Sequence, residues 1–116
     1  MAKNTHQEDG DYLSLPVPSG TVSGGPVRVG TIANGLNGVA ETARGAGGNA
    51  AGYASVQLQG VHEFTVTLAG AIAEGGPVYI TSANALNDTA ASNALFGHAV
   101  KASASGTVTL RVRIAN

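Results

Sequence analysis

The clearest alternation of apolar and polar residues lies near the end of the chain. In Val108-Thr-Leu-Arg-Val-Arg-Ile114, every second residue is apolar and the residues between them are threonine or arginine. Successive side chains of a β-strand point to opposite faces, so a period of two is typical of a half-buried strand. The pattern therefore predicts a strand over residues 108–114.

A longer alternation runs from Val56 to Leu68 and exceeds the usual strand length of about five or six residues. Gly60 falls in its first half and has no side chain to pack, so a bend or bulge is expected there. We predict two strands joined at a corner.

Weaker patterns predict further short strands separated by turn-rich loops. The strands are expected at Tyr12–Leu15, Val27–Val29, Val78–Thr81 and Gly97–Lys101. Glycine and alanine predict a flexible loop at Thr42–Ala54, and Ser82–Asn93 reads as a loop or a wide hairpin. No helical periodicity is convincing, although a single turn around Ala69–Glu74 is possible.

The chain also repeats itself. Gly24-Gly-Pro-Val-Arg-Val29 is followed 51 residues later by Gly75-Gly-Pro-Val-Tyr-Ile80. Shorter matches join Gly38-Val-Ala40 to Gly97-His-Ala99, and Val56-Gln-Leu58 to Val108-Thr-Leu110. Each copy reads as turn, strand, loop, strand, loop and strand. The sequence therefore predicts an all-β fold with little helix, built from two related β units packed as a small barrel or sandwich.

Composition limits the size of the core. The chain has 116 residues, enough for one domain, which we assign to residues 12–116, preceded by an N-terminal arm at residues 1–11. Apolar residues make up 43%, but 20 of them are alanine and only 26 are Leu, Ile, Val or Phe. Because a monomer core of this kind is thin, burial of further apolar surface in an oligomer is expected.

Charge disfavours two classes of partner. The net charge is −1 and the six Lys and Arg residues are spread along the chain, whereas nucleic-acid binding needs clustered positive charge. No apolar stretch approaches the length of a membrane-spanning helix, and the N-terminus lacks a signal-peptide pattern. With no cysteine in the chain, we expect synthesis in a cytosol without an oxidising step.

Candidate chemistry is sparse, and we predict no catalytic, cofactor or metal site. His6, His62 and His98 are far apart, and His62 is expected to be a partly buried, hydrogen-bonded side chain. The acidic residues 8, 9 and 11 lack the spacing of a calcium loop and read as a solvated turn. Gly45-Ala-Gly47-Gly-Asn-Ala50 fits a loose dinucleotide-binding pattern, but that pattern has meaning only between a strand and a helix.

In order along the chain, these segments resemble a family of small phage head proteins, the capsid cement or decoration proteins of the DUF2190 type. The segments that carry the resemblance are Asn4–Pro16, Ser23–Gly30, Gly38–Thr42, Val56–Phe64, Ala71–Tyr79, Leu95–Ala102 and Gly106–Ile114. Each motif consists of common turn and strand residues, so the resemblance rests on their ordered sum. Two positions depart from the family pattern: Gly76 stands where an acidic residue is common, and His62 replaces an aromatic residue.

The resemblance implies a β-tulip-like module that binds the outer surface of the expanded capsid of the virion as a homotrimer. It would clamp neighbouring subunits of the major capsid protein against the pressure of packaged DNA. An N-terminal arm that adds a strand to an open sheet edge is also implied. The contact residues expected on this basis are Asn4, Thr5, His6, Gln7, Tyr12 and Leu13. A merely frayed terminus is the alternative for residues 1–7, and the 42–54 loop could be either a solvent-facing tip or a trimer contact.

Other classes of function are weighed against this one. A carbohydrate- or receptor-binding β module is the principal alternative, but such sites usually offer several aromatic side chains, and this chain has three tyrosines and no tryptophan. An enzyme lacks a reactive constellation, and a fibre subunit would show longer repeats.

Overall fold

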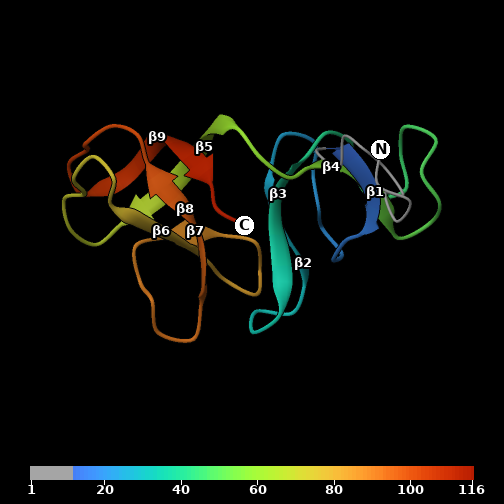
Figure 1. Ribbon diagram of the computed structural model, residues 1–116, viewed down its shortest axis with the longest axis horizontal. Helices are drawn as coiled ribbons and strands as arrows, with labels where there is room; N and C mark the ends of the chain where they lie inside the picture. The colour runs from blue at the N-terminus through green and yellow to red at the C-terminus, as the bar shows by residue number, and fades with distance from the viewer. Residues whose placement is uncertain (1–11) are drawn as a thin grey trace, which may run out of the picture.

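The computed structural model describes residues 12–116, which form nine strands and, within that range, no helix. The strands divide into an open four-stranded sheet and a closed five-stranded barrel, which lie side by side (Figure 1). We call β1–β4 the N-terminal unit and β5–β9 the barrel. Their bounds are β1 Tyr12–Pro16, β2 Pro26–Gly30, β3 Gly35–Ala40, β4 Tyr53–Gln57, β5 Val61–Leu68, β6 Pro77–Ile80, β7 Leu86–Asn87, β8 Ala94–Ala99 and β9 Gly106–Ile114. No helix of the described residues is long and apolar enough to cross a membrane.

The alternating patterns are confirmed as strands. The apolar face of β9 buries Leu110, Val112 and Ile114, while Arg111 and Arg113 are exposed. The long alternation is two strands, β4 and β5, and they belong to different sheets. The chain turns between them at residues 58–60, where glycine adopts a φ of 106° that other residues rarely take.

Three local expectations need correction. β8 begins at Ala94 and ends at Ala99, earlier than expected, because the preceding loop closes at Asn93, whose N–H donates to the Ala90 carbonyl over 3.2 Å. The 82–93 segment contains the two-residue strand β7. Residues 69–74 form no helical turn; instead, Ile72 makes an isolated antiparallel bridge to a residue of the β8–β9 loop.

The two units share one strand order, which confirms the duplication read from the sequence. In the N-terminal unit the order is β1-β4-β3-β2, and in the barrel the corresponding order is β5-β9-β8-β6, all joined by antiparallel pairs. The barrel adds β7, which pairs in parallel with β5 and antiparallel with β6 and so closes the gap between them. Within residues 12–116 the N-terminal unit has no such strand, and its sheet is open.

Equivalent turns before β2 and β6 make equivalent hydrogen bonds. The Gly24 N–H donates to the Ala40 carbonyl over 2.7 Å, and the Gly75 N–H donates to the Ala99 carbonyl over the same distance. Both glycines have a φ of 80–85°, the left-handed region that glycine adopts without strain. The repeated Gly-Gly-Pro thus encodes the same turn twice.

The structure corrects the alignment of the last strand of each unit. A side chain at Gly38 would clash with Val56, and one at the equivalent Gly97 would lie 2.8 Å from Cγ1 of Val112. Both glycines leave room for a valine of the adjoining strand. Val56 is therefore equivalent to Val112, and its sequence match to Val108 is wrong.

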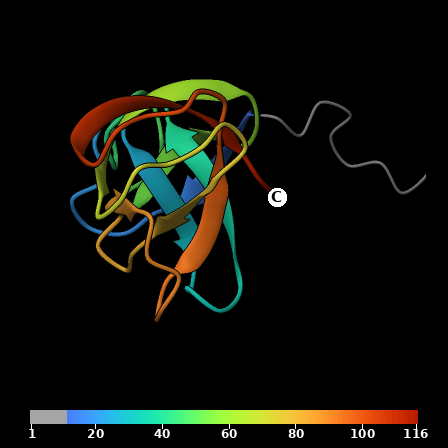
Figure 2. The ribbon, with the colours of Figure 1, turned by 90° about the vertical axis from the view of Figure 1, so that its left-hand side faces the viewer.

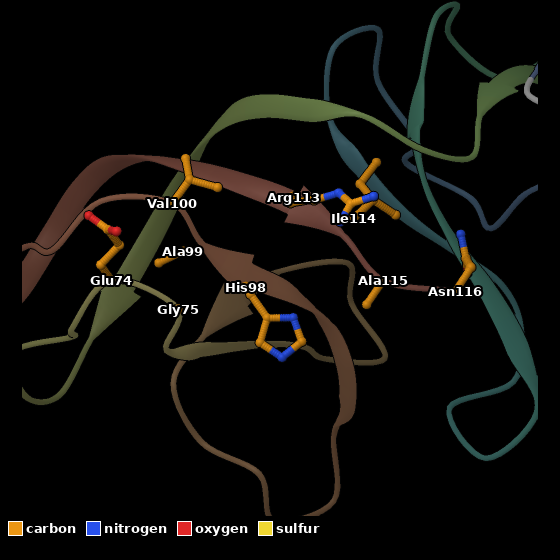
Figure 3. Close-up of a pocket in the computed structure, with 9 residues that line it drawn as sticks. All are labelled: Glu74, Gly75, His98, Ala99, Val100, Arg113, Ile114, Ala115 and Asn116. Carbon is orange, nitrogen blue, oxygen red and sulfur yellow. The ribbon is translucent and has the colours of Figure 1, made fainter.

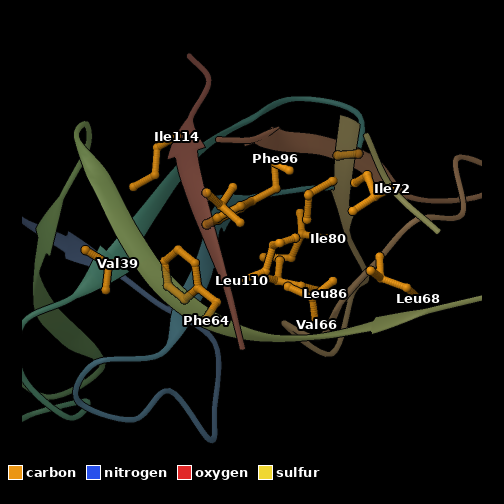
Figure 4. Close-up of a cluster of buried hydrophobic side chains, with 14 residues drawn as sticks. Val39, Phe64, Val66, Leu68, Ile72, Ile80, Leu86, Phe96, Leu110 and Ile114 are labelled. Atoms are coloured by element: carbon orange, nitrogen blue, oxygen red, sulfur yellow. The ribbon is translucent and has the colours of Figure 1, made fainter. Parts of the chain in front are cut away.

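The barrel holds the larger core (Figure 4). Phe64 and Phe96 meet edge to face with ring centroids 5.3 Å apart, a favourable arrangement for aromatic rings. Val39 comes from β3 of the N-terminal unit but packs into this barrel core. The N-terminal unit has a smaller core of its own, made of Val17, Val27, Val29, Ala54 and Val56.

A buried asparagine joins the two units. Asn37 is 3% exposed, and its amide group donates to the carbonyl oxygens of Leu95 and Ala115 over 2.8 and 2.7 Å. Its side-chain oxygen accepts a hydrogen bond from Arg28 over 2.8 Å. Its backbone N–H and carbonyl pair with the side chain of Asn116 over 2.8 and 2.9 Å. Every polar group of this residue is thus paired, as burial requires.

Candidate functional site

Strand β1 forms one border of the open sheet. It pairs with β4, and no strand among residues 12–116 pairs with its other edge. The Val17 N–H donates to the Gly52 carbonyl, on the β4 side, over 3.0 Å. Because N–H groups of an antiparallel edge strand alternate in direction, those of Tyr12 and Ser14 point away from β4. The N–H of Ser14 therefore faces the edge of β1 that no strand among residues 12–116 covers.

Prolines close the rest of this edge. Pro16 and Pro18 stand at the next two outward positions, where a proline offers no N–H to a further strand. At the opposite border of the sheet, Pro26 lacks an N–H and the outward N–H of Arg28 donates to Oδ1 of Asn84 over 3.2 Å. Strand addition is thus disfavoured at the proline positions of both borders and favoured at the first half of β1.

Side chains beside the open edge are partly exposed and polar or aromatic. Tyr12 is 51% exposed and Tyr53 of β4 is 40% exposed. Leu13 points to the opposite face from Tyr12 and is half-buried. Between the tyrosines, the Ser14 hydroxyl donates to Oδ1 of Asn49 over 2.5 Å.

The loop between β3 and β4 is fixed to the sheet by two of its side chains. The amide of Asn49 donates to the Ser55 hydroxyl over 3.1 Å and to the Ala46 carbonyl over 2.7 Å. Nε of Arg44 donates to the Val17 carbonyl over 3.1 Å. The loop thus lies against β1 and β4. Its glycine-rich pattern stands between two strands, which is not the strand-to-helix context of a dinucleotide site.

Of the six predicted contact residues, the structure describes two. Tyr12 and Leu13 lie at the start of the open edge, whereas Asn4, Thr5, His6 and Gln7 lie outside the described residues. Sequence reasoning missed Ser14 and the closing role of the prolines. A signal was present, since prolines two residues apart within a strand pattern are typical of a strand edge.

The histidines and carboxylates form no common site in the described range. His62 is half-buried, with Nε2 3.1 Å from the Gln59 carbonyl and its ring 6.1 Å from that of Phe64, as expected. Residues 12–116 contain no group of three or more His, Cys, Asp or Glu side chains able to hold a metal ion. The acidic residues 8, 9 and 11 lie outside the described residues.

An open hollow of about 630 Å³ lies on the barrel, beside the C-terminal residues (Figure 3). Its charged or titratable side chains are Glu74, His98 and Arg113, which come from three different segments of the barrel. The residues that line this hollow include no hydroxyl or thiol side chain that could act as a nucleophile.

Comparison with known proteins gives a family to this fold. A family profile described as phage cement protein matches residues 7–114, nearly the whole chain. The chain belongs to the phage cement protein family. Neither the curated protein sequences nor the solved structures gave a significant match.

Membership of the phage cement family supports a structural role in the capsid. The family is not known for enzymatic activity, and it does not favour the carbohydrate- or receptor-binding alternative. The matched segment begins at Gln7 and includes Tyr12 and Leu13, while Asn4, Thr5 and His6 precede it.

Proposed function

We propose that this protein binds the outer surface of the expanded phage head and stabilises the contacts between subunits of the major capsid protein. The observation that carries the proposal is the family match over residues 7–114. In this proposal the chain is made in the host cytoplasm, residues 12–116 act as one β domain, and three copies bind together as a homotrimer. No cofactor, membrane or nucleic acid takes part.

Stabilisation follows from preferential binding. A protein that binds the expanded lattice and not the unexpanded one lowers the free energy of the expanded state by about 2.7 kcal/mol per site at about 100 times Kd. A trimer that contacts several capsid subunits gains further affinity, because its second and third contacts form at a high effective concentration. Weak individual contacts therefore suffice.

The arm and β1 supply the capsid contacts in this proposal. Residues Asn4, Thr5, His6 and Gln7 precede β1 in the sequence, and in this proposal they pair, together with Tyr12 and Leu13, with an open sheet edge of the capsid. Support comes from the outward N–H of Ser14 and from the prolines that end this edge. The two flanking tyrosines add exposed aromatic surface.

Co-sedimentation tests the binding. Purified protein is mixed with expanded, undecorated heads and with unexpanded proheads of the cognate phage, and the pelleted protein is quantified. Saturable binding to expanded heads together with a higher melting temperature of those heads is expected. Equal binding to both particles, or no binding to either, contradicts the proposal.

A pair of variants tests the open edge. Ser14→Pro removes an outward N–H, whereas Ser14→Ala removes the hydroxyl bonded to Asn49 and keeps that N–H. We expect Ser14→Pro to weaken head binding about tenfold, the cost of one or two hydrogen bonds, and Ser14→Ala to have much less effect. Thermal unfolding of both variants verifies that they fold. Equal binding by the two excludes strand addition at this edge.

A further inference from the structure

The duplicated units place equivalent residues in one row across their strands. In the N-terminal unit the row crosses β1, β4, β3 and β2, and its members pair in register: Tyr12, Gln57, Val39 and Pro26. In the barrel the equivalent row crosses β5, β9, β8 and β6: Val61, Arg113, His98 and Pro77. Both rows lie on the outer face of their unit, opposite its core.

The end of the first row formed by Val39 and Pro26 is a docking surface within the chain, whereas Tyr12 at the other end is 51% exposed. Val39 is 7% exposed and belongs to the core cluster of the barrel, although it stands on the outer face of its own sheet. Near the end of that row, Ser23 and Pro26 line the same hollow as Glu63 and Thr65 of β5. One β unit of this chain therefore packs through this row against the β5 side of the other.

The second row is uncovered. Val61 is 51% exposed, and His98, Arg113 and Pro77 are all exposed. Beside them lies the open hollow of about 630 Å³ (Figure 3). The barrel thus presents to solvent the surface that, in the N-terminal unit, holds a neighbouring unit (Figure 2 shows the barrel side of the molecule).

We propose that this uncovered row binds the N-terminal unit of a second copy of the chain, in the way that the first row binds the barrel. The inference rests on the homotrimer of the proposed function and names its interface. Because the two surfaces differ, the contact is head to tail, and it closes into a ring when the rotation allows. Glu74 and Pro77 are equivalent to Ser23 and Pro26 of the internal hollow, and Ser14 and Pro16 are equivalent to Glu63 and Thr65. In the proposed contact, Glu74 and Pro77 of one copy therefore meet Ser14 and Pro16 of the next.

The barrel row differs from its equivalent in the N-terminal unit at two positions. The barrel row has arginine where the N-terminal unit has Gln57, and histidine where it has Val39. The interface is also more polar than the internal one, as expected of contacts that form and separate.

Cross-linking tests the interface, and the absence of cysteine from the chain makes it direct. Ser14→Cys and Glu74→Cys are made as separate single variants, mixed, and treated with a short bismaleimide, both in solution at high concentration and on expanded heads. The head-to-tail contact predicts a product that joins one variant to the other and that neither forms alone. Thr107→Cys, exposed at the far end of β9, replaces Glu74→Cys in the control mixture and is expected to give no product.

Variants of the row supply a second readout. His98→Val introduces the side chain that the N-terminal unit has at the equivalent position, Val39. It is expected to raise the yield of cross-linked product at limiting concentration about tenfold, the effect of burying one aliphatic side chain. Arg113→Glu places a second carboxylate in the hollow that Glu74 lines, and its burial in the contact is expected to lower the yield about tenfold. Arg113→Gln, which reproduces Gln57, is expected to keep the yield.

The two proposals fail separately. Head binding without the Ser14–Glu74 product in either setting overturns the interface and leaves the cement function standing. A product in solution from a protein that binds no heads supports the interface and overturns the cement function. Products from either variant alone indicate a two-fold contact and also overturn the interface.

Discussion

Replacement of Asn37 by alanine tests whether the buried junction holds the two units together. The change removes two N–H donors from the carbonyls of Leu95 and Ala115 and one acceptor from Arg28. The backbone bonds to Asn116 remain possible. With about 1 kcal/mol or more for each buried group left without a partner, the free energy of unfolding falls by about 3 kcal/mol. Small domains have about 5–15 kcal/mol in total, so this loss is large.

Urea unfolding followed by circular dichroism measures the change. With an m value of about 2 kcal/mol per molar, a loss of about 3 kcal/mol lowers the midpoint by about 1.5 M. The matched control is Asn49→Ala, which also removes side-chain hydrogen bonds, but partly exposed ones to Ser14 and Ser55. Water replaces those, so a loss below about 1 kcal/mol is expected. Equal midpoints for the two variants would refute the reasoning that burial makes Asn37 essential.

Three further changes have defined outcomes. Gly97→Ala places a methyl group against a backbone carbonyl of β9 and is expected to lower the free energy of unfolding by about 1–3 kcal/mol. Gly70→Ala meets open space and is expected to leave it unchanged. Thermal unfolding compares the two variants, and equal melting temperatures contradict the packing argument. Hydrogen bonds from the N–H groups of Ala69 and Gly70 lower the pKa of Asp88. Its stabilising effect is therefore complete above the ordinary carboxyl pKa of about 4 and disappears as the pH falls through the lowered value. Melting temperatures from pH 2 to 7 should show wild type more stable than Asp88→Asn above about pH 4 and the gap closing below it, and a constant gap would exclude this linkage. Phe96→Ala removes a fully buried ring and is expected to cost about 3–5 kcal/mol by urea unfolding, and a cost below about 1 kcal/mol would show that the barrel core refills the cavity.

The sequence predicts the parts of this fold that depend on local patterns. Alternation over residues 108–114 identifies β9, and Gly60 marks the corner that sends β4 and β5 into different sheets. The repeated Gly-Gly-Pro identifies the duplication, because the same turn geometry demands the same residues.

What the sequence does not predict depends on long-range contacts. β7 has two residues, too few for a period, and exists because β5 and β6 bind it from either side. Asn37 looks like an ordinary polar residue, since its side-chain partners in the barrel lie 58 and 78 residues away. The sequence also does not predict that Val56 is equivalent to Val112, because short valine-containing matches fit several alignments. The contacts of Gly38 with Val56 and of Gly97 with Val112 decide among these alignments.

The arrangement of β1 has a mechanical consequence. Tyr12 at its start lies opposite Gln57, and the chain passes from Gln57 directly towards the barrel. A force applied between the N-terminus and the barrel therefore acts on β1 and β4 at the same end and breaks the hydrogen bonds between them one after another. Strands loaded in this way resist little force. Tension on the residues before Tyr12 would peel β1 away. In the proposed cement function, these residues therefore attach the protein to the head, and the broad faces of the two units carry the load.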